Sequence, residues 1–91
     1  MELDKYRIEY SKDVLKKDIP KLDASIRKLI KKAIDTKLIA NPMLYGKPMS
    51  YAFSGQRALR VGNYRVIYKI DDKNKIVTIE AIGHRRNSYD L

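Results

Sequence analysis

The chain has 91 residues, a length that suits one small domain, and we expect residues 1–91 to form a single unit. It contains no cysteine and one histidine, which excludes disulfides and argues against a zinc site. Its 20 Lys and Arg side chains outnumber 11 Asp and Glu, so the formal net charge is +9. This excess attracts phosphates, so we expect nucleic acid as the partner, ahead of an acidic protein or a membrane surface.

The apolar runs are too short to cross a membrane, and the first residues lack the apolar core of a signal peptide. Neither of the glycine-rich patterns typical of nucleotide-binding loops occurs. The sequence therefore predicts a cytoplasmic protein with no membrane partner, no metal and no small-molecule cofactor.

The N-terminal part reads as a strand followed by a short helix. Apolar and polar residues alternate over Tyr6–Tyr10, which indicates a strand with one buried face. Ser11 is a suitable N-cap for a helix that begins near Val14 and Leu15. Pro20 should end or bend this helix, because proline has no backbone N–H.

A second helix is predicted from an N-cap at Asp23 to Ala40, before Asn41-Pro42. Apolar residues recur at helical spacing along one face: Leu22, Ile26, Leu29, Ile30, Ala33, Ile34 and Leu38. Basic residues occupy most of the other face: Lys21, Arg27, Lys28, Lys31, Lys32 and Lys37. A solvated helix surface is the simplest interpretation of these lysines, and an auxiliary phosphate-contacting face is the alternative.

The C-terminal half reads as a loop and three strands. Residues 41–55 contain prolines and glycines and are expected to be a loop that packs on the domain. Arg57–Val61 and Tyr64–Ile70 flank a turn at Gly62-Asn63, which is typical of a β-hairpin. After a polar turn, Ile76–Ile82 is the last predicted strand.

The predicted order is therefore β-α-α-β-β-β. Because the two helices are adjacent in sequence and the hairpin strands follow them, we expect an α+β fold. Its small, mainly antiparallel sheet would carry both N-terminal helices on one face. The other face would then be partly open.

Arginines fill polar positions of the hairpin. Alternation places Tyr64 and its apolar neighbours in the core and directs Arg65 and Lys69 to the other face, where Arg60 should join them. Arg85 follows the last strand and can reach the same area. Guanidinium groups that converge on an open sheet can bind a phosphate, because their planar donors match its oxygens. The alternative is a set of surface salt bridges, which contribute little.

Two further residues could take part in chemistry or have a structural role. His84 is the single histidine, and it is either a structural side chain or a group for proton transfer or RNA contact. Tyr89 is either an aromatic anchor of the C-terminus or a ring that stacks on an RNA base.

With these residues in place, the chain resembles the RelE/ParE superfamily of toxins from type II toxin–antitoxin pairs. The resemblance rests on residues 59–68, Leu-Arg-Val-Gly-Asn-Tyr-Arg-Val-Ile-Tyr, and residues 81–89, Ala-Ile-Gly-His-Arg-Arg-Asn-Ser-Tyr. Asn41-Pro42, Gly46-Lys47-Pro48 and Ser54-Gly55 fit the preceding loop. The strand and helix order fits as well, so a RelE-like fold is implied over nearly the whole chain.

The resemblance implies a metal-independent endoribonuclease that enters the ribosomal A site and cuts the mRNA codon there. The RNA 2′-hydroxyl would attack the adjacent phosphorus. By analogy, Arg65 would support the phosphate, Arg85 would stabilise charge or protonate the leaving oxygen, and Tyr89 would stack on or orient the nucleotide. We expect further RNA contacts from the basic residues Arg57, Arg60, Lys69 and Arg86, with Arg57 on the opposite face if strand pairing is regular.

The chain departs from the family pattern where proton transfer is concerned. Gln56 and Ala58 stand where RelE carries a lysine pair, and Met49 stands where YoeB-type relatives carry a glutamate base. His84 is then the first candidate for the proton-transfer group, and Glu80 is the second.

The resemblance also implies a cognate antitoxin, a disordered acidic or amphipathic segment that folds on binding across the basic face and groove. Val14, Leu15 and Tyr51 are its candidate contacts. Two alternatives to the nuclease stay open: a ParE-like inhibitor of DNA gyrase without nuclease activity, and a non-catalytic nucleic-acid-binding module.

Overall fold

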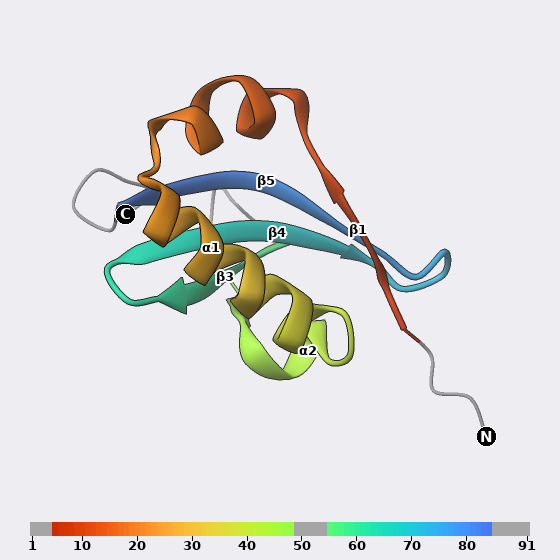
Figure 1. The fold of residues 1–91 in the computed structure, drawn as a ribbon. Coiled ribbons are helices and arrows are strands. Elements are labelled where there is room, and N and C mark those ends of the chain that lie inside the picture. The colour runs from red at the N-terminus through yellow and green to blue at the C-terminus, as the bar shows by residue number, and fades with distance from the viewer. Residues whose placement is uncertain (1–4, 49–54, 85–91) are drawn as a thin grey trace.

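The computed structural model describes residues 5–48 and 55–84, which form one five-stranded sheet with helical segments packed against it (Figure 1). The strands are β1 (Arg7–Tyr10), β2 (Lys47–Pro48), β3 (Gln56–Val61), β4 (Tyr64–Asp71) and β5 (Ile76–His84). Their order is β1-β5-β4-β3-β2, with β1 parallel to β5 and the other neighbours antiparallel. The predicted α+β fold with a mainly antiparallel sheet is confirmed.

The helical segments are η1 (Val14–Asp18), η2 (Ile19–Lys21), α1 (Ala24–Ala33), η3 (Ile34–Leu38) and α2 (Pro42–Tyr45). Figure 1 shows η1, η2 and α1 on the same face of the sheet, as predicted. The structure differs from the prediction in residues 41–55, which contain α2 and β2 as well as loop. Pro42 begins α2, because proline is suited to the first helical position, where its missing N–H is not needed.

Local signals near the two helices act as the sequence suggests. The Ser11 hydroxyl accepts a hydrogen bond from the Val14 backbone N–H, with an N–O distance of 3.2 Å, so it caps the first helical turns. Pro20 lies at the start of η2, where it bends the chain without breaking a helical hydrogen bond. Asp23 holds the N-cap position of α1 in an extended conformation, although its side chain makes no capping bond.

The core lies between the sheet and the helical segments. Its fully buried members come from both layers: Val14, Ile34 and Leu38 from the helical side, and Val66, Tyr68, Val77 and Ile79 from the strands. Two expectations are wrong. Val14, a candidate antitoxin contact, is 0% exposed because it faces the sheet, and Leu29, a predicted core residue, is 49% exposed on the outer side of α1.

Strand pairing fixes which residues share a face of the sheet. Val66 lies opposite Leu59 on one side and Ile82 on the other, so these apolar residues all face the helices. The ladder between β4 and β5 shifts after Ile67, and Glu80 is an extra residue in β5. Because of this bulge, apolar side chains of β5 on both sides of Glu80, such as Ile79 and Ile82, face the core.

Two glycines have conformations or contacts that other residues would not tolerate. Gly62 has φ +59°, as the first central residue of a type II′ hairpin turn requires. This turn determines which residues of β3 and β4 pair with each other. Gly46 packs against the buried ring of Tyr68, and a Cβ there would lie 2.0 Å from the Tyr68 hydroxyl oxygen. That hydroxyl donates to the Pro42 carbonyl at 2.5 Å, so Gly46 and Tyr68 together hold α2 on the sheet.

Gly46→Ala should therefore lower the free energy of unfolding by about 3 kcal/mol, because Tyr68 is enclosed and has no room to move away. Gly62→Ala is the matched comparison. It introduces the same methyl group at a backbone position with positive φ, where no other atom lies within 4 Å of the new Cβ. This change should lower the free energy of unfolding by about 1 kcal/mol. Urea denaturation of the two variants measures both values. Equal losses, or a larger loss for Gly62→Ala, would contradict the packing described for Gly46.

Candidate functional site

The sheet face opposite the helices carries a pair of arginines on neighbouring strands. Arg60 in β3 is directly opposite Arg65 in β4, and Arg65 is directly opposite Gly83 in β5. Directly paired residues project from the same face, so the side chains of Arg60 and Arg65 leave neighbouring positions of one face, and Gly83 beside Arg65 carries no side chain. Arg60 is exposed and Arg65 is half-buried.

Lysines extend this positive surface along the sheet. Lys47 pairs with Ala58 in register, and Lys69 lies one alternate position beyond Ile67 in β4, so both project from the face that carries Arg65. We call the set Arg60, Arg65, Lys69 and Lys47 the arginine face. As predicted, Arg60, Arg65 and Lys69 share one side of the sheet.

The arginine face is partly open, and its middle is buried. Ala58, Ile67 and Ala81 form a row across three strands, and Ile67 is only 3% exposed although it lies outside the main core cluster. Beyond this row Gln56 donates a short hydrogen bond to Glu80, which places a carboxylate on the same face. The face thus combines cations at its ends with an apolar centre.

Arg57 faces the helices, as regular pairing predicts. Its guanidinium donates to the backbone carbonyls of Met43 and Gly46, with both N–O distances 2.6 Å, so it holds the end of α2. Burial raises the pKa of the neighbouring Tyr68, and the Arg57 charge opposes this increase. The structure therefore separates Arg57 from the arginine face, and RNA binding by Arg57 stays a prediction without support from this geometry.

His84 is also on the helix side of the sheet. It pairs with Tyr64 at the end of the β4–β5 ladder, and the two rings make an edge-to-face contact with centroids 5.2 Å apart. The structure does not bring His84 onto the face of Arg65, because adjacent residues of a strand project to opposite sides. Arg85, Arg86 and Tyr89 lie outside the described residues, so their predicted roles stay predictions.

A cavity of about 320 Å³ lies beside the Tyr64–His84 pair. It is lined by residues of the η1–η2 segment and the strand ends: Asp18, Lys21, Leu22, Tyr64, Ile82, Gly83 and His84. The Asp18 carboxylate accepts a hydrogen bond from the Ile82 backbone N–H at 2.8 Å, which ties η1 to β5. We call this the end cavity. The sequence analysis gives Asp18 no role, because its partner Ile82 is 64 residues away and no local pattern indicates the contact.

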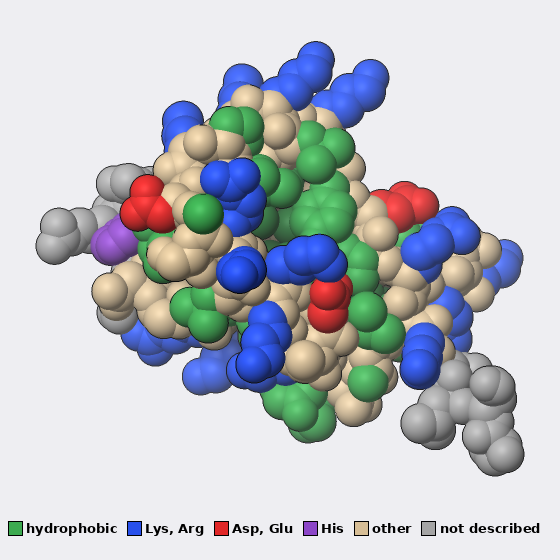
Figure 2. Space-filling view, in the orientation of Figure 1, with side chains coloured by type: hydrophobic (Ala, Val, Ile, Leu, Met, Phe, Trp, Pro, Cys, Tyr) green, Lys and Arg blue, Asp and Glu red, His purple; other side chains and the backbone are tan. Residues whose placement is uncertain are grey.

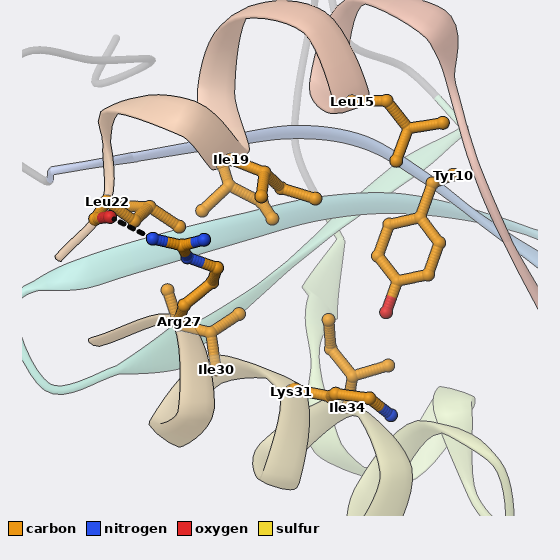
Figure 3. Close-up of a pocket in the computed structure, with 9 residues that line it drawn as sticks. Tyr10, Leu15, Ile19, Leu22, Arg27, Ile30, Lys31 and Ile34 are labelled. Atoms are coloured by element: carbon orange, nitrogen blue, oxygen red, sulfur yellow. Dashed lines mark hydrogen bonds between the residues drawn. The ribbon is translucent and has the colours of Figure 1, made fainter. Parts of the chain in front are cut away.

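An apolar groove runs between the η1–η2 segment and α1. Figure 2 shows exposed apolar side chains in this hollow with Lys and Arg side chains around it. Leu15, Ile19 and Leu22 line one wall, and Ile30 of α1 and Ile34 of η3 line the other (Figure 3). We call this the helix-side groove, and its volume is about 240 Å³.

Charged groups stand at the rim of the helix-side groove. The Arg27 guanidinium donates to the Leu22 carbonyl at 3.1 Å, and Lys31 pairs with Asp35 at 2.8 Å. Tyr10 closes the far end, and burial raises the pKa of its hydroxyl. Leu15 is 54% exposed, which agrees with its prediction as a partner contact, whereas Tyr51 lies outside the described residues.

Over residues 5–48 and 55–84, no cluster of three or more His, Cys, Asp or Glu side chains has the arrangement of a metal site. The helices in the same part of the chain are too short or too polar to cross a membrane.

Comparison with known proteins gives a consistent result. Residues 5–89 match the family described as the ParE toxin of the type II toxin-antitoxin system parDE. Toxin RelG of Mycobacterium tuberculosis is 31% identical over 74 residues, which cover 81% of this chain and 85% of that protein. Toxin RelE of the same organism is 34% identical over 75 residues, which cover 82% of this chain and 77% of that toxin.

Solved structures agree with this fold. The toxin–antitoxin complex RelBE2 from Mycobacterium tuberculosis contains a chain with a TM-score of 0.83 and 28% identity, over 89% of this chain and 99% of that one. The archaeal RelE–RelB complex from Pyrococcus horikoshii gives a TM-score of 0.71 at 22% identity, over 92% and 99% of the two chains, which shows the shared fold. The chain therefore belongs to the ParE toxin family, within the RelE/ParE superfamily of type II toxins.

The contact between Asp18 and β5 gives a testable consequence for stability. Asp18→Ala should lower the free energy of unfolding by about 1–3 kcal/mol, because Ile82 is 4% exposed and its N–H would lose its acceptor. Asp18→Asn should cost less than about 1 kcal/mol, because the amide oxygen can still accept this bond. The control is Asp13→Ala, an exposed carboxylate that makes no capping bond. Urea denaturation measures the free energy of unfolding of each variant. If Asp18→Ala lowers it no more than Asp13→Ala does, the hydrogen bond between Asp18 and Ile82 does not stabilise the fold.

Proposed function

We propose that this type II toxin is a ribosome-dependent endoribonuclease that cleaves mRNA codons in the A site and so stops translation. The observation that supports it most is the direct pairing of Arg60 and Arg65 across β3 and β4. Guanidinium groups on one face suit a phosphate, because each offers a planar fork of donors that matches phosphate oxygens. An RNA phosphate placed between Arg60 and Arg65 would therefore be bound by both side chains.

The reaction we propose is attack of the RNA 2′-hydroxyl on the adjacent phosphorus. The 2′-oxygen forms a bond to phosphorus while the bond to the 5′-oxygen of the next nucleotide breaks, which leaves a 2′,3′-cyclic phosphate and a 5′-hydroxyl. Negative charge builds up on the phosphorane oxygens, and preorganised cations stabilise that state more than the ground state. In this proposal Arg65 supports the phosphate, and the guanidinium groups supply the positive charge without a metal.

The remaining steps are assigned to residues near the end of β5. Arg85 would stabilise charge or protonate the leaving oxygen, and Tyr89 would orient the nucleotide. Of the two candidates for the proton acceptor, Glu80 lies on the arginine face and His84 lies on the helix side. This placement favours Glu80 for a phosphate bound at Arg65, and it reverses the order of preference expected from the sequence.

RNA binding outside the reacting phosphate is assigned to Arg60, Lys69 and Arg86. Exposed cations along a single-stranded RNA release counterions when they neutralise phosphates, so they contribute affinity without base preference. Arg60 and Lys69 are exposed on the arginine face and fit that role. Ribosomal RNA at the A site is the second RNA surface that this proposal requires.

A second candidate function is inhibition of DNA gyrase by a protein-binding mechanism without nuclease activity. It is favoured by the family match, which is described as a ParE toxin. The separation of His84 from Arg65 also fits a protein in which these residues do not form one catalytic centre.

The two functions are separated by inducing the protein in cells and mapping the 5′ ends of mRNA. The nuclease predicts cuts in phase with codons inside translated frames, whereas a gyrase poison predicts intact mRNA and broken chromosomal DNA. Arg65→Ala and Arg85→Ala should each lower the cleavage rate by about 10²–10³-fold. Thermal midpoints should stay near that of the parent protein.

The control variant is Arg7→Ala, an exposed arginine in the edge strand β1 that pairs with Glu9. It should cleave like the parent protein. Unfolding of both Arg65→Ala and Arg85→Ala, or cleavage unaffected by either, would contradict the nuclease proposal.

We also propose that a cognate antitoxin binds the helix-side groove as an amphipathic helix with acidic flanks. The groove is apolar along its floor, and Arg27 and Lys31 stand at its rim, so its charge complements acidic side chains. Relatives named as RelE–RelB complexes support the existence of such a partner.

Leu15→Lys tests this assignment, because it places a charge in the apolar wall at a 54%-exposed position. The antitoxin encoded beside the gene should then bind at least about thirtyfold more weakly, as expected when a central apolar contact is lost. Toxicity without antitoxin should be retained. Leu44→Lys, at a 70%-exposed leucine of α2 that does not line the groove, is the control. Titration calorimetry measures the affinities, and equal binding by both variants would reject the groove as the docking site.

A further inference from the structure

The end cavity has a composition that differs from both other surfaces. The helix-side groove is apolar and the arginine face is cationic, whereas the end cavity combines one carboxylate, one ammonium group and two aromatic rings. Asp18 and Lys21 come from the η1–η2 segment, and Tyr64 and His84 come from the last pair of the β4–β5 ladder. Its volume of about 320 Å³ is at the lower end of the range for small-molecule sites.

The carboxylate argues against a phosphate as the occupant. Asp18 would repel an anion, and the Lys21 charge alone offers no fork of donors for phosphate oxygens. One Asp18 oxygen accepts from the Ile82 N–H, but an ionised carboxylate has about four acceptor positions, so it can accept further hydrogen bonds. Aromatic rings beside these groups suit a flat ligand with both donors and acceptors on its edge.

Guanine matches this arrangement better than the other RNA bases. Its Watson–Crick edge carries two neighbouring N–H donors, which one carboxylate can accept together, and a carbonyl oxygen that an ammonium group can donate to. Adenine and cytosine offer an amino group but no second ring N–H donor beside it, and uracil offers a single N–H donor. We propose that the end cavity binds a guanine base of the RNA, with Asp18 and Lys21 reading its edge and Tyr64 against its ring.

The position of the cavity makes it reachable from the reacting phosphate. Tyr64 and Arg65 are adjacent in β4 and project to opposite faces, and Tyr64 with His84 is the last pair before the end of the sheet. Among the residues that the structure describes at this end, Gly83 lies opposite Arg65 and has no side chain that would stand between Arg65 and the cavity. An RNA strand with a phosphate at Arg65 can therefore pass around the sheet end and place a neighbouring base in the cavity. This step of the inference rests on the proposed nuclease function.

The test is titration of the full chain with GMP, AMP, CMP and UMP, observed by NMR at the backbone N–H of Ile82 and the rings of Tyr64 and His84. GMP should shift these resonances with an affinity at least about tenfold higher than AMP, since one bidentate base contact gives this discrimination. Asp18→Asn keeps an acceptor for Ile82 but loses the paired acceptors for guanine, and should remove the preference. Asp35→Asn, a carboxylate of η3 outside the cavity, is the control and should retain it.

Equal affinities for the four nucleotides would overturn the inference, as would GMP shifts confined to residues on the arginine face. A GMP preference that Asp18→Asn leaves unchanged would overturn the role of Asp18 and with it the proposal. These outcomes are independent of cleavage. If GMP binds in the cavity but the protein leaves mRNA intact, the nuclease proposal is rejected and the base site is retained. If the protein cuts mRNA in phase with codons but shows no preference for GMP, the base site is rejected and the nuclease proposal is retained.

Discussion

The register of the β3–β4 hairpin is the constraint on which the functional surfaces depend. Gly62 alone in the turn has a left-handed backbone, and this type II′ turn places Arg60 opposite Arg65. Because the side chains of a strand alternate, a slip of β3 by one residue against β4 would turn Arg60 toward the helices and expose Leu59. The burial of apolar residues such as Leu59 therefore fixes the place of the charged ones, and packing energy holds the cations in position.

The same alternation separates the tasks of the two faces. On the helix side, the core and the helix-side groove are built mainly from apolar residues, and the end cavity combines aromatic rings with Asp18 and Lys21. On the other side, the arginine face carries cations around a buried isoleucine. An antitoxin helix in the helix-side groove would leave the arginine face uncovered. To inhibit the toxin, the antitoxin would then need a second segment that covers the arginine face, or the complex would have to be too large to reach its target.

The sequence predicted the strands well because alternation and turn residues are local signals. It placed Arg65 and Tyr64 on opposite faces, and the structure confirms this. It missed α2 and β2, which depend on a distant contact: Arg57 and Tyr68 bind carbonyls of residues 42–46. It named His84 as the first candidate for proton transfer, and only the strand pairing shows that this side chain and Arg65 project from opposite faces of the sheet. Asp18 and the end cavity arise from contacts across 64 residues, which no local pattern encodes.

The central claim is that the arginine face binds the RNA backbone, and the salt dependence of RNA binding tests it most directly. A short RNA with 2′-O-methyl groups cannot be cleaved by the proposed chemistry and can be titrated at several salt concentrations. The account predicts that Arg60→Gln reduces the slope of log affinity against log salt by about 0.7, the value for one phosphate contact to a single strand, and that Arg7→Gln leaves it unchanged. Equal slopes for the parent protein and Arg60→Gln would contradict the account.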